Sequence, residues 1–160
     1  MSEVKSVPDG CNTINAYLIV KDGQAAIDFY QTAFGMKGGM CMPGPNGKGI
    51  MHAELHLGNS TIMLTEENEQ WGTKSAETMG GSPASLHLYV DNVDEAFKKA
   101  IDAGCTETYP VMDTFWGDRY GKLTDPFGYQ WGIATHVEDV PENEMQQRAE
   151  AWFQQAGEQG

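Results

Sequence analysis

The sequence predicts an α+β fold made of two tandem βαβββ modules. A strand-then-helix pattern occurs at 15–20 with 24–30, and again at 85–90 with 94–100. The two copies are offset by seventy residues, and equivalent apolar positions match at that offset. Self-similarity at a fixed period indicates a duplicated structural unit, so the repeat sets the frame for every later assignment.

The first module is assigned to residues 12–67. It is predicted to contain a strand at 15–20, a helix at 24–34 and strands at 36–42, 50–57 and 61–65. In the first strand, Ala16, Leu18 and Val20 alternate with larger, partly polar residues, so this face is expected to meet the helix. Gly35 follows the helix where a left-handed C-cap is expected.

The second module is assigned to residues 84–136 and repeats that order. It is predicted to contain a strand at 85–90, a helix at 93–103 and strands at 106–110, 119–124 and 129–135. Residues 68–83 are expected to form an exposed linker, and the acidic tail 137–160 a helix that opens near Pro141. Together the modules are expected to form one structural domain.

Composition excludes several classes of function. The 160 residues carry a formal net charge of −13 and no basic stripe, which disfavours nucleic acid as a partner. No apolar run is long enough to cross a membrane, and the N-terminus lacks the pattern of a secretory signal, so a cytoplasmic protein is expected. Three cysteines without a Cys-x-x-Cys pair favour reduced thiols over a disulfide framework.

Three short strings support a family resemblance. These are His52-Ala-Glu-Leu55, Phe115-Trp-Gly-Asp-Arg119 and Asp125-Pro-Phe-Gly-Tyr-Gln-Trp131. With the duplicated βαβββ unit, they resemble the PhnB-like branch of the vicinal oxygen chelate superfamily, which includes glyoxalase I, extradiol dioxygenases and bleomycin-resistance proteins. The resemblance implies curled mixed sheets around a small-molecule cavity, in a homodimer.

The resemblance also implies where a divalent metal would be bound. Family metalloenzymes use a His, Glu or Gln on the first strand and a Glu or His on the last strand of each module. The matching positions hold Asn15, Ile62 or Met63, Ser85 and Gly132. These side chains are poor or unsuitable ligands for such ions, so the usual metal site is expected to be absent and no cofactor is expected.

A polar row on the strand at 50–57 gives the first candidate site. His52, Glu54 and His56 alternate with apolar residues and therefore share one face. Three interpretations stay open: a solvated strand face, a metal-free acid–base or hydrogen-bonding pair formed by His52 and Glu54, and a displaced metal site formed by all three.

Further candidate ligand-binding residues come from both modules. Tyr17, His87 and Tyr89 lie on the strand faces opposite the helices, although for His87 the role of a hydrogen-bonded inner residue is favoured over that of a catalyst. Trp116, Asp118 and Arg119 combine an aromatic ring with an ion-pairable guanidinium that can hold a carboxylate or phosphonate. The alternative is that Asp118 and Arg119 form a structural pair while Trp116 fills core.

Two functional hypotheses follow. The first is a small-molecule-binding protein of this superfamily, with a metal-independent or non-standard-metal lyase or isomerase step carried by His52 and Glu54. The second is a protein that sequesters a drug or metabolite without changing it. Standard glyoxalase I or extradiol dioxygenase activity is not expected, because both rely on the metal that polarises the substrate.

Overall fold

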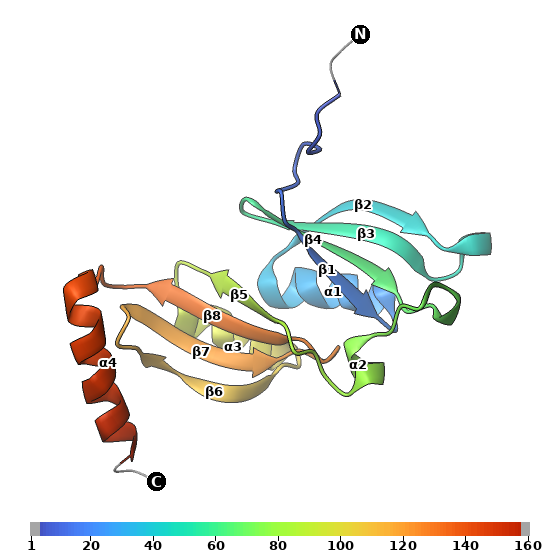
Figure 1. Cartoon of the computed structure of the whole chain (residues 1–160). Helices are drawn as coiled ribbons and strands as arrows, with labels where there is room; N and C mark the ends of the chain where they lie inside the picture. Colours follow the sequence, from blue (N-terminus) through green and yellow to red (C-terminus); the bar gives the residue numbers. More distant parts are fainter. Residues whose placement is uncertain (1–3, 158–160) are drawn as a thin grey trace. The chain divides into compact units, whose positions relative to one another are not determined.

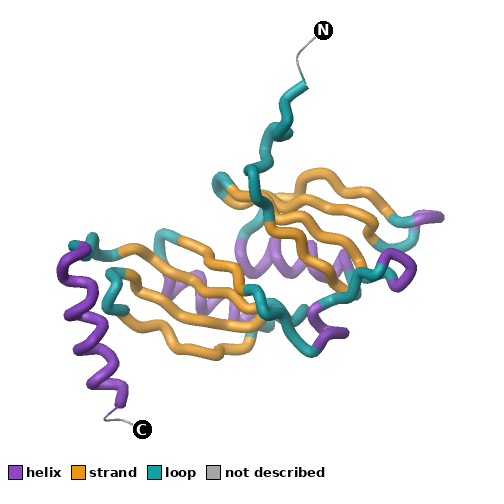
Figure 2. Tube along the Cα trace, viewed as in Figure 1, coloured by secondary structure: helices purple, strands orange, loops and turns teal. Residues whose placement is uncertain are grey.

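Residues 4–157 are described by a computed structural model (Figure 1). It contains two four-stranded mixed sheets with the strand orders β1-β4-β3-β2 and β5-β8-β7-β6. The equivalent order in both sheets confirms the predicted duplication, and neither sheet closes into a barrel. Figure 2 shows the strands of each sheet running side by side with one helix against them.

The chain divides into two compact units. Unit 1 comprises the residues up to Pro83 together with Pro126–Tyr129, and unit 2 comprises Ala84–Asp125 and the residues from Gln130 onward. The four-residue segment 126–129 was expected to belong to the second module, but its side chains pack within unit 1.

The strands and helix of unit 1 follow the predicted order. They are β1 (Ala16–Val20), α1 (Gly23–Phe34), β2 (Lys37–Pro43), β3 (Ile50–Leu57) and β4 (Ser60–Glu66), with the short helices η1 (Pro45–Gly47), η2 (Glu69–Trp71) and α2 (Ala76–Met79) in the connections. Strand β1 pairs in parallel with β4, whereas β3 pairs antiparallel with both β4 and β2. This places β3 inside the sheet and leaves β1 and β2 at its edges.

Helix α1 covers one face of the first sheet. Asp22 caps its N-terminus by accepting a hydrogen bond from the Ala25 N–H, and Gly35 ends it with φ 70°, the predicted left-handed C-cap. Tyr30 of α1 and Leu64 of β4 are fully buried in the core between helix and sheet. The predicted helix-facing side of β1 is therefore confirmed, because Leu18 and Val20 are buried with them.

Two aromatic residues from segment 126–129 complete the core of unit 1. Phe127 contacts the rings of Phe29 and Tyr30, with centroid separations of 5.6 and 5.7 Å. Tyr129 donates a hydrogen bond to the Ile19 carbonyl (2.9 Å) and accepts one from the Ile19 N–H (2.8 Å). The sequence signal for this segment was a turn, which gives no information about which core its neighbours enter.

The predicted linker 68–83 is only partly exposed. Ser75 and Ala76 are buried. The Ser75 N–H donates to a Glu67 carboxylate oxygen (2.9 Å), and the Ser75 hydroxyl caps α2. These contacts correct the expectation of a wholly exposed connection. They also hold the pKa of Glu67 at about 2, mainly through hydrogen bonds from Ser75 and Thr78.

Unit 2 repeats the arrangement and adds a terminal helix. Its elements are β5 (Ser85–Tyr89), α3 (Val93–Ala103), β6 (Thr106–Asp113), β7 (Asp118–Thr124), β8 (Gln130–His136) and α4 (Glu142–Gly157). Strand β6 runs three residues beyond its predicted end, past Pro110. The register shifts on both sides of Tyr109, an irregularity that accommodates proline on an edge strand. Helix α4 begins after Pro141, as predicted.

No helix within residues 4–157 combines the length and apolar character needed to cross a bilayer.

Candidate functional sites

The polar row on β3 lies on the open face of the first sheet. Ala53 and Leu55 are buried beneath α1, so the alternation of the strand turns His52, Glu54 and His56 to the opposite face. In the neighbouring strands, Met63 pairs with Glu54 and also with Tyr17. The structure thus brings the predicted residues Tyr17, His52 and Glu54 together in unit 1.

The side chains of this row form a chain of polar contacts. The Tyr17 hydroxyl lies 3.2 Å from His52 Nδ1, and His52 Nε2 lies 3.5 Å from Glu54 Oε1. Glu54 Oε2 lies 3.8 Å from His56 Nε2, and His56 Nδ1 lies 2.9 Å from the Thr61 hydroxyl, which donates to the Gly10 carbonyl. Glu54 is therefore flanked by two imidazoles, at distances longer than an ordinary hydrogen bond.

A pocket opens beside Glu54. It has a volume of about 390 Å³. Its lining consists of Asp9, Gly10, Cys11, Glu54, His56, Gly58, Asn59, Ser60 and Thr61. The Glu54 side chain is 19% exposed, compared with 37% for His56. We call this space the Glu54 pocket.

The residues at the usual metal positions do not fit a divalent ion. Asn15 has both ends of its amide engaged by the backbone of Asn12. Of the two alternatives on β4, Met63 rather than buried Ile62 shares the face of Glu54, and its thioether favours soft metals. Within residues 4–157, no group of three or more His, Cys, Asp or Glu side chains is arranged to hold a metal ion.

Tyr120 fills the space beside the last-strand position of unit 2. A Cβ atom at Gly132 would lie 2.7 Å from Cε2 and 2.8 Å from the hydroxyl oxygen of Tyr120. A longer side chain at this position would need the same space. Position 132 therefore carries no metal-binding side chain, and the Tyr120 ring occupies the space that such a side chain would need.

Aromatic side chains line the open face of the second sheet. His87 stacks on Tyr120 with centroids 5.5 Å apart and an interplanar angle of 9°, and it lies 4.7 Å from the Tyr89 ring. Trp116 contacts Tyr120 edge to face at 5.7 Å. His87 is exposed rather than buried, so the structure brings the predicted residues His87, Tyr89 and Trp116 together on one face.

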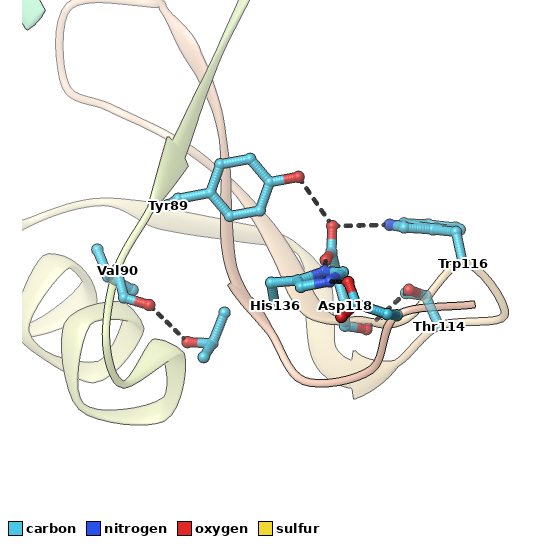
Figure 3. Close-up of polar contacts among 8 residues, drawn as sticks. Tyr89, Val90, Thr114, Trp116, Asp118 and His136 are labelled. Carbon is cyan, nitrogen blue, oxygen red and sulfur yellow. Dashed lines mark hydrogen bonds and ion pairs between the residues drawn. The ribbon is translucent and has the colours of Figure 1, made fainter. Parts of the chain in front are cut away.

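Asp118 lies at the end of this face and binds three donors (Figure 3). The Tyr89 hydroxyl and the Trp116 indole N–H both donate to Oδ2 at 3.0 Å, and His136 Nδ1 lies 2.8 Å from Oδ1. The Asp118 side chain is only 3% exposed. Burial opposes ionisation, but the hydrogen bonds from His136, Tyr89 and Trp116 together hold the pKa of Asp118 below its ordinary value.

His136 completes this cluster and was not among the predicted site residues. Its Nε2 lies 2.9 Å from Oδ1 of Asp139. Hydrogen bonds to Asp139 and Asp118 raise the pKa of His136 above its ordinary value. The predicted last strand ended at residue 135, one position short of His136. Continuing its alternation from Gly132 would have placed His136 on the open face.

Arg119 lies away from this cluster. Its neighbours on β7, Gly121 and Leu123, face α3, and its guanidinium binds Asp94 of α3 through two hydrogen bonds of 2.8 Å. A third contact of 3.1 Å reaches Asp113. The predicted neighbours Asp118 and Arg119 therefore point to opposite sides of the sheet and do not pair with each other.

Comparison with known proteins identifies the family. The model of the glyoxalase/bleomycin resistance protein/dioxygenase superfamily matches residues 11–133 of the chain. The chain belongs to this superfamily. The predicted family resemblance is thus confirmed over most of the sequence.

Relatives within the superfamily are similar in sequence and in fold. An uncharacterized protein of Mycobacterium bovis is 40% identical over 136 residues, which cover 83% of this chain and 89% of the relative. The crystal structure of an Arabidopsis thaliana gene product is 27% identical, with a TM-score of 0.64 over 77% of this chain and 98% of that one.

A PhnB protein from Bacillus cereus, described as a putative 3-demethylubiquinone-9 3-methyltransferase, shares the superfamily fold. It is 15% identical, with a TM-score of 0.58 over 78% of this chain and 99% of that one. This likeness supports the predicted PhnB-like fold alone.

Proposed function

We propose that the chain binds a small organic molecule in the Glu54 pocket of unit 1. The observation that supports this most directly is the position of Glu54, whose carboxylate lies between His52 and His56 beside an open pocket of about 390 Å³. That volume falls in the range of small-molecule sites in proteins. Membership of the superfamily supports the same conclusion.

The row can also move a proton. A carboxylate 3.5 Å from an imidazole needs only a small adjustment, or a bound ligand, to form an acid–base pair. In this version Glu54 or His52 removes a proton from the ligand and returns it elsewhere, which is a lyase or isomerase type of step. The proposal requires no metal ion and no cofactor.

A second candidate function is sequestration without chemistry. It is favoured by the charge of the chain, −13, and by the carboxylate of Glu54 in the pocket lining. A cationic ligand would be attracted to such a pocket. Under this alternative, the polar row provides hydrogen bonds and charge but transfers no proton.

A ligand screen tests the binding proposal. Neutral and cationic small molecules are added to the full chain, and binding is detected as an increase in thermal unfolding midpoint, followed by calorimetric titration. Glu54→Gln removes the negative charge of the side chain and keeps its shape, so it should weaken the binding of every ligand of the pocket. Glu69→Gln changes an exposed carboxylate outside the lining and is the matched control. Ligands that bind both variants equally well would contradict the proposed site.

The same variants separate catalysis from sequestration. If Glu54 transfers a proton, Glu54→Gln should abolish conversion of a ligand that the native chain consumes. Titration with a cationic glycopeptide should instead saturate at fixed stoichiometry, with the ligand recovered unchanged, if the chain only sequesters. Unchanged turnover in Glu54→Gln would remove Glu54 from the mechanism.

The metal requirement is tested by elemental mass spectrometry. Protein purified without a histidine tag is measured before and after equilibration with Zn²⁺, Ni²⁺, Mn²⁺ and Fe²⁺. The proposal expects no stoichiometric retention. Near one equivalent of a bound ion, lost in Glu54→Gln or His52→Ala, would instead establish the displaced site formed by His52, Glu54 and His56.

We also propose a homodimer as the working form, on the basis of the family resemblance. Light scattering coupled to size-exclusion chromatography on the full chain measures its mass directly. A mass near the 17.6 kDa of one chain would contradict the dimer.

A further inference from the structure

The strongest feature outside the Glu54 pocket is the pair formed by Asp118 and His136 in unit 2. A nearly buried carboxylate is bound to one nitrogen of a half-exposed imidazole, whose side chain is 51% exposed. The other nitrogen, Nε2, lies 2.9 Å from Oδ1 of Asp139. Asp118 thus orients the imidazole, while Nε2 is engaged by a fully exposed carboxylate at the surface.

Asp118 fixes which nitrogen of His136 carries the proton. Its carboxylate already accepts hydrogen bonds from Tyr89 and Trp116, and it is held ionised, so it acts as an acceptor for the Nδ1–H of His136. When the imidazole is neutral, its lone pair therefore lies on Nε2. Burial and the hydrogen bond to Asp118 raise the pKa of Tyr89, so its hydroxyl remains a donor.

The contact between Asp139 and Nε2 is favourable when His136 is protonated. The Asp139 side chain is fully exposed, so this contact lies at the surface and is screened by solvent. When His136 loses its proton, the lone pair of Nε2 faces a carboxylate that can only accept, and the contact is no longer favourable. A ligand that donates a hydrogen bond can then take the place of Asp139.

The surroundings of Nε2 define the chemistry of such a ligand. Asp118 and Asp139 are the charged groups in contact with His136, and Tyr89 reaches it through Asp118. Glu138, two residues after His136 in the sequence, accepts two hydrogen bonds from Arg148. Two carboxylates disfavour an anion at this position, so a hydroxyl that binds here keeps its proton and can donate it to a hydrogen bond.

Aromatic rings lie next to the pair. Tyr89 is 60% exposed and shares Asp118 with Trp116, and the rings of His87 and Tyr120 continue the same face. Planar ligands stack well on such rings. The face therefore matches a flat molecule with a hydroxyl at its edge.

We propose that unit 2 holds a second small-molecule site, in which Nε2 of His136 accepts a hydrogen bond from the hydroxyl of an uncharged, planar phenol or enol. Asp118 is the positioning residue that keeps Nε2 as the acceptor. The aromatic face formed by His87, Tyr89, Trp116 and Tyr120 binds the ring of the ligand. This site is independent of the Glu54 pocket.

The experiment compares two ligands that differ only in the hydroxyl proton. 2-Naphthol and 2-methoxynaphthalene are titrated into the full chain, and the histidine ring nitrogens are followed by NMR, with His136→Gln assigning the signal. A neutral hydrogen bond contributes about 0.5–1.5 kcal/mol, so 2-naphthol should bind about 2- to 12-fold more tightly than the ether. This preference should appear only as the pH rises through the pKa of His136.

Variants distinguish the proposed roles. Asp139→Asn removes the competing carboxylate and lowers the pKa of His136, so the preference for 2-naphthol should extend to lower pH. Asp118→Asn should lower the same pKa and allow both neutral tautomers, which the ring-nitrogen shifts report directly and a purely structural role would not produce. Asp118 is buried, and its replacement can impair folding. The same titrations are therefore also made with Asp139→Asn and Tyr89→Phe.

Three outcomes would overturn the proposal. They are equal affinity for the two naphthalenes at every pH, a preference that persists in His136→Gln, and ligand binding that leaves the His136 nitrogen signals unchanged. Absence of 2-naphthol binding at millimolar concentration would equally reject the site. None of these outcomes depends on the Glu54 pocket, because Glu54→Gln should leave the naphthol titration unchanged.

Discussion

The contact between one glycine and one tyrosine shapes the open face of the second sheet. The ring of Tyr120 lies against the backbone of Gly132 and stacks on His87. A side chain at residue 132 would have to displace that ring. Loss of the usual ligand position and gain of an aromatic surface are thus two consequences of one contact.

Gly132→Ala should therefore destabilise the protein. Its Cβ would lie 2.7 Å from Tyr120, and overpacking of this kind costs about 1–3 kcal/mol in the free energy of unfolding. Urea denaturation measures the loss. Gly38→Ala is the control, because its Cβ would meet only the flexible end of Gln31 at 3.1 Å. A smaller residue at position 120, as in Tyr120→Leu, should recover stability in the Gly132→Ala background; additive losses would show that the two sites are not coupled.

Cys41 and Cys105 should differ in reactivity. Burial, with a smaller effect from Asp125, raises the pKa of the Cys105 thiol to about 12, whereas Cys41 is exposed on edge strand β2. Since the thiolate is the reactive form, iodoacetamide should label Cys41 in the native protein and Cys105 only after denaturation. Peptide mass spectrometry identifies the labelled residue. Rapid native labelling of Cys105 would contradict its burial.

At the scale of elements, β1 is an edge strand completed by the hydroxyl of Tyr129. That hydroxyl satisfies both the N–H and the carbonyl of Ile19 on the side of β1 away from β4. Segment 126–129 thereby closes one edge of the first sheet. Unpaired backbone groups at an edge are otherwise left to water or to another chain.

Tyr129→Phe tests this role. Removing the hydroxyl leaves the Ile19 groups without this partner and should cost about 1–3 kcal/mol of unfolding free energy, with faster hydrogen exchange at the Ile19 amide. Tyr109→Phe serves as the control, since its hydroxyl donates only to the weak acceptor Sδ of Met112 and should cost roughly 0.5 kcal/mol or less. Equal losses in the two variants would argue against a special contribution from Tyr129.

Local patterns in the sequence were sufficient for most elements but not for their partners. Alternation and capping signals correctly predicted β3 at 50–57, α3 at 93–103 and the turn at Gly35. The same signals could not show that segment 126–129 enters unit 1, because its contacts with α1 and β1 are distant in sequence.

The candidate site was predicted in a similar way. Strand periodicity placed Glu54 between two histidines on one face, and the structure brings them together. It did not show that Arg119 binds Asp94, because that contact depends on how α3 packs against β7. His136 was missed because the predicted strand ended before it, although its partner Asp118 was among the residues chosen.

At the scale of the whole molecule, groups with lowered pKa values limit stability at acid pH, and a group with a raised pKa limits it at alkaline pH. Glu67 has a pKa of about 2, against an ordinary value of 4.5, so its contribution is present above pH 4.5 and is lost as the pH falls toward 2. Asp118, Asp94 and Glu138 are shifted in the same direction. His136 is shifted the other way, so its contribution is present below its ordinary value of 6.5 and is lost as the pH rises through its higher native pKa.

Thermal unfolding should therefore show its highest midpoint between about pH 4.5 and about pH 6.5. The scans are run at constant ionic strength, because screening of a net charge of −13 would otherwise change with buffer composition. Glu67→Gln should flatten the acid side of the profile and leave the alkaline side unchanged, and His136→Gln should do the reverse. A midpoint that rises steadily from pH 6.5 to pH 9 in the native chain would show that the contacts of His136 with Asp118 and Asp139 do not stabilise the fold.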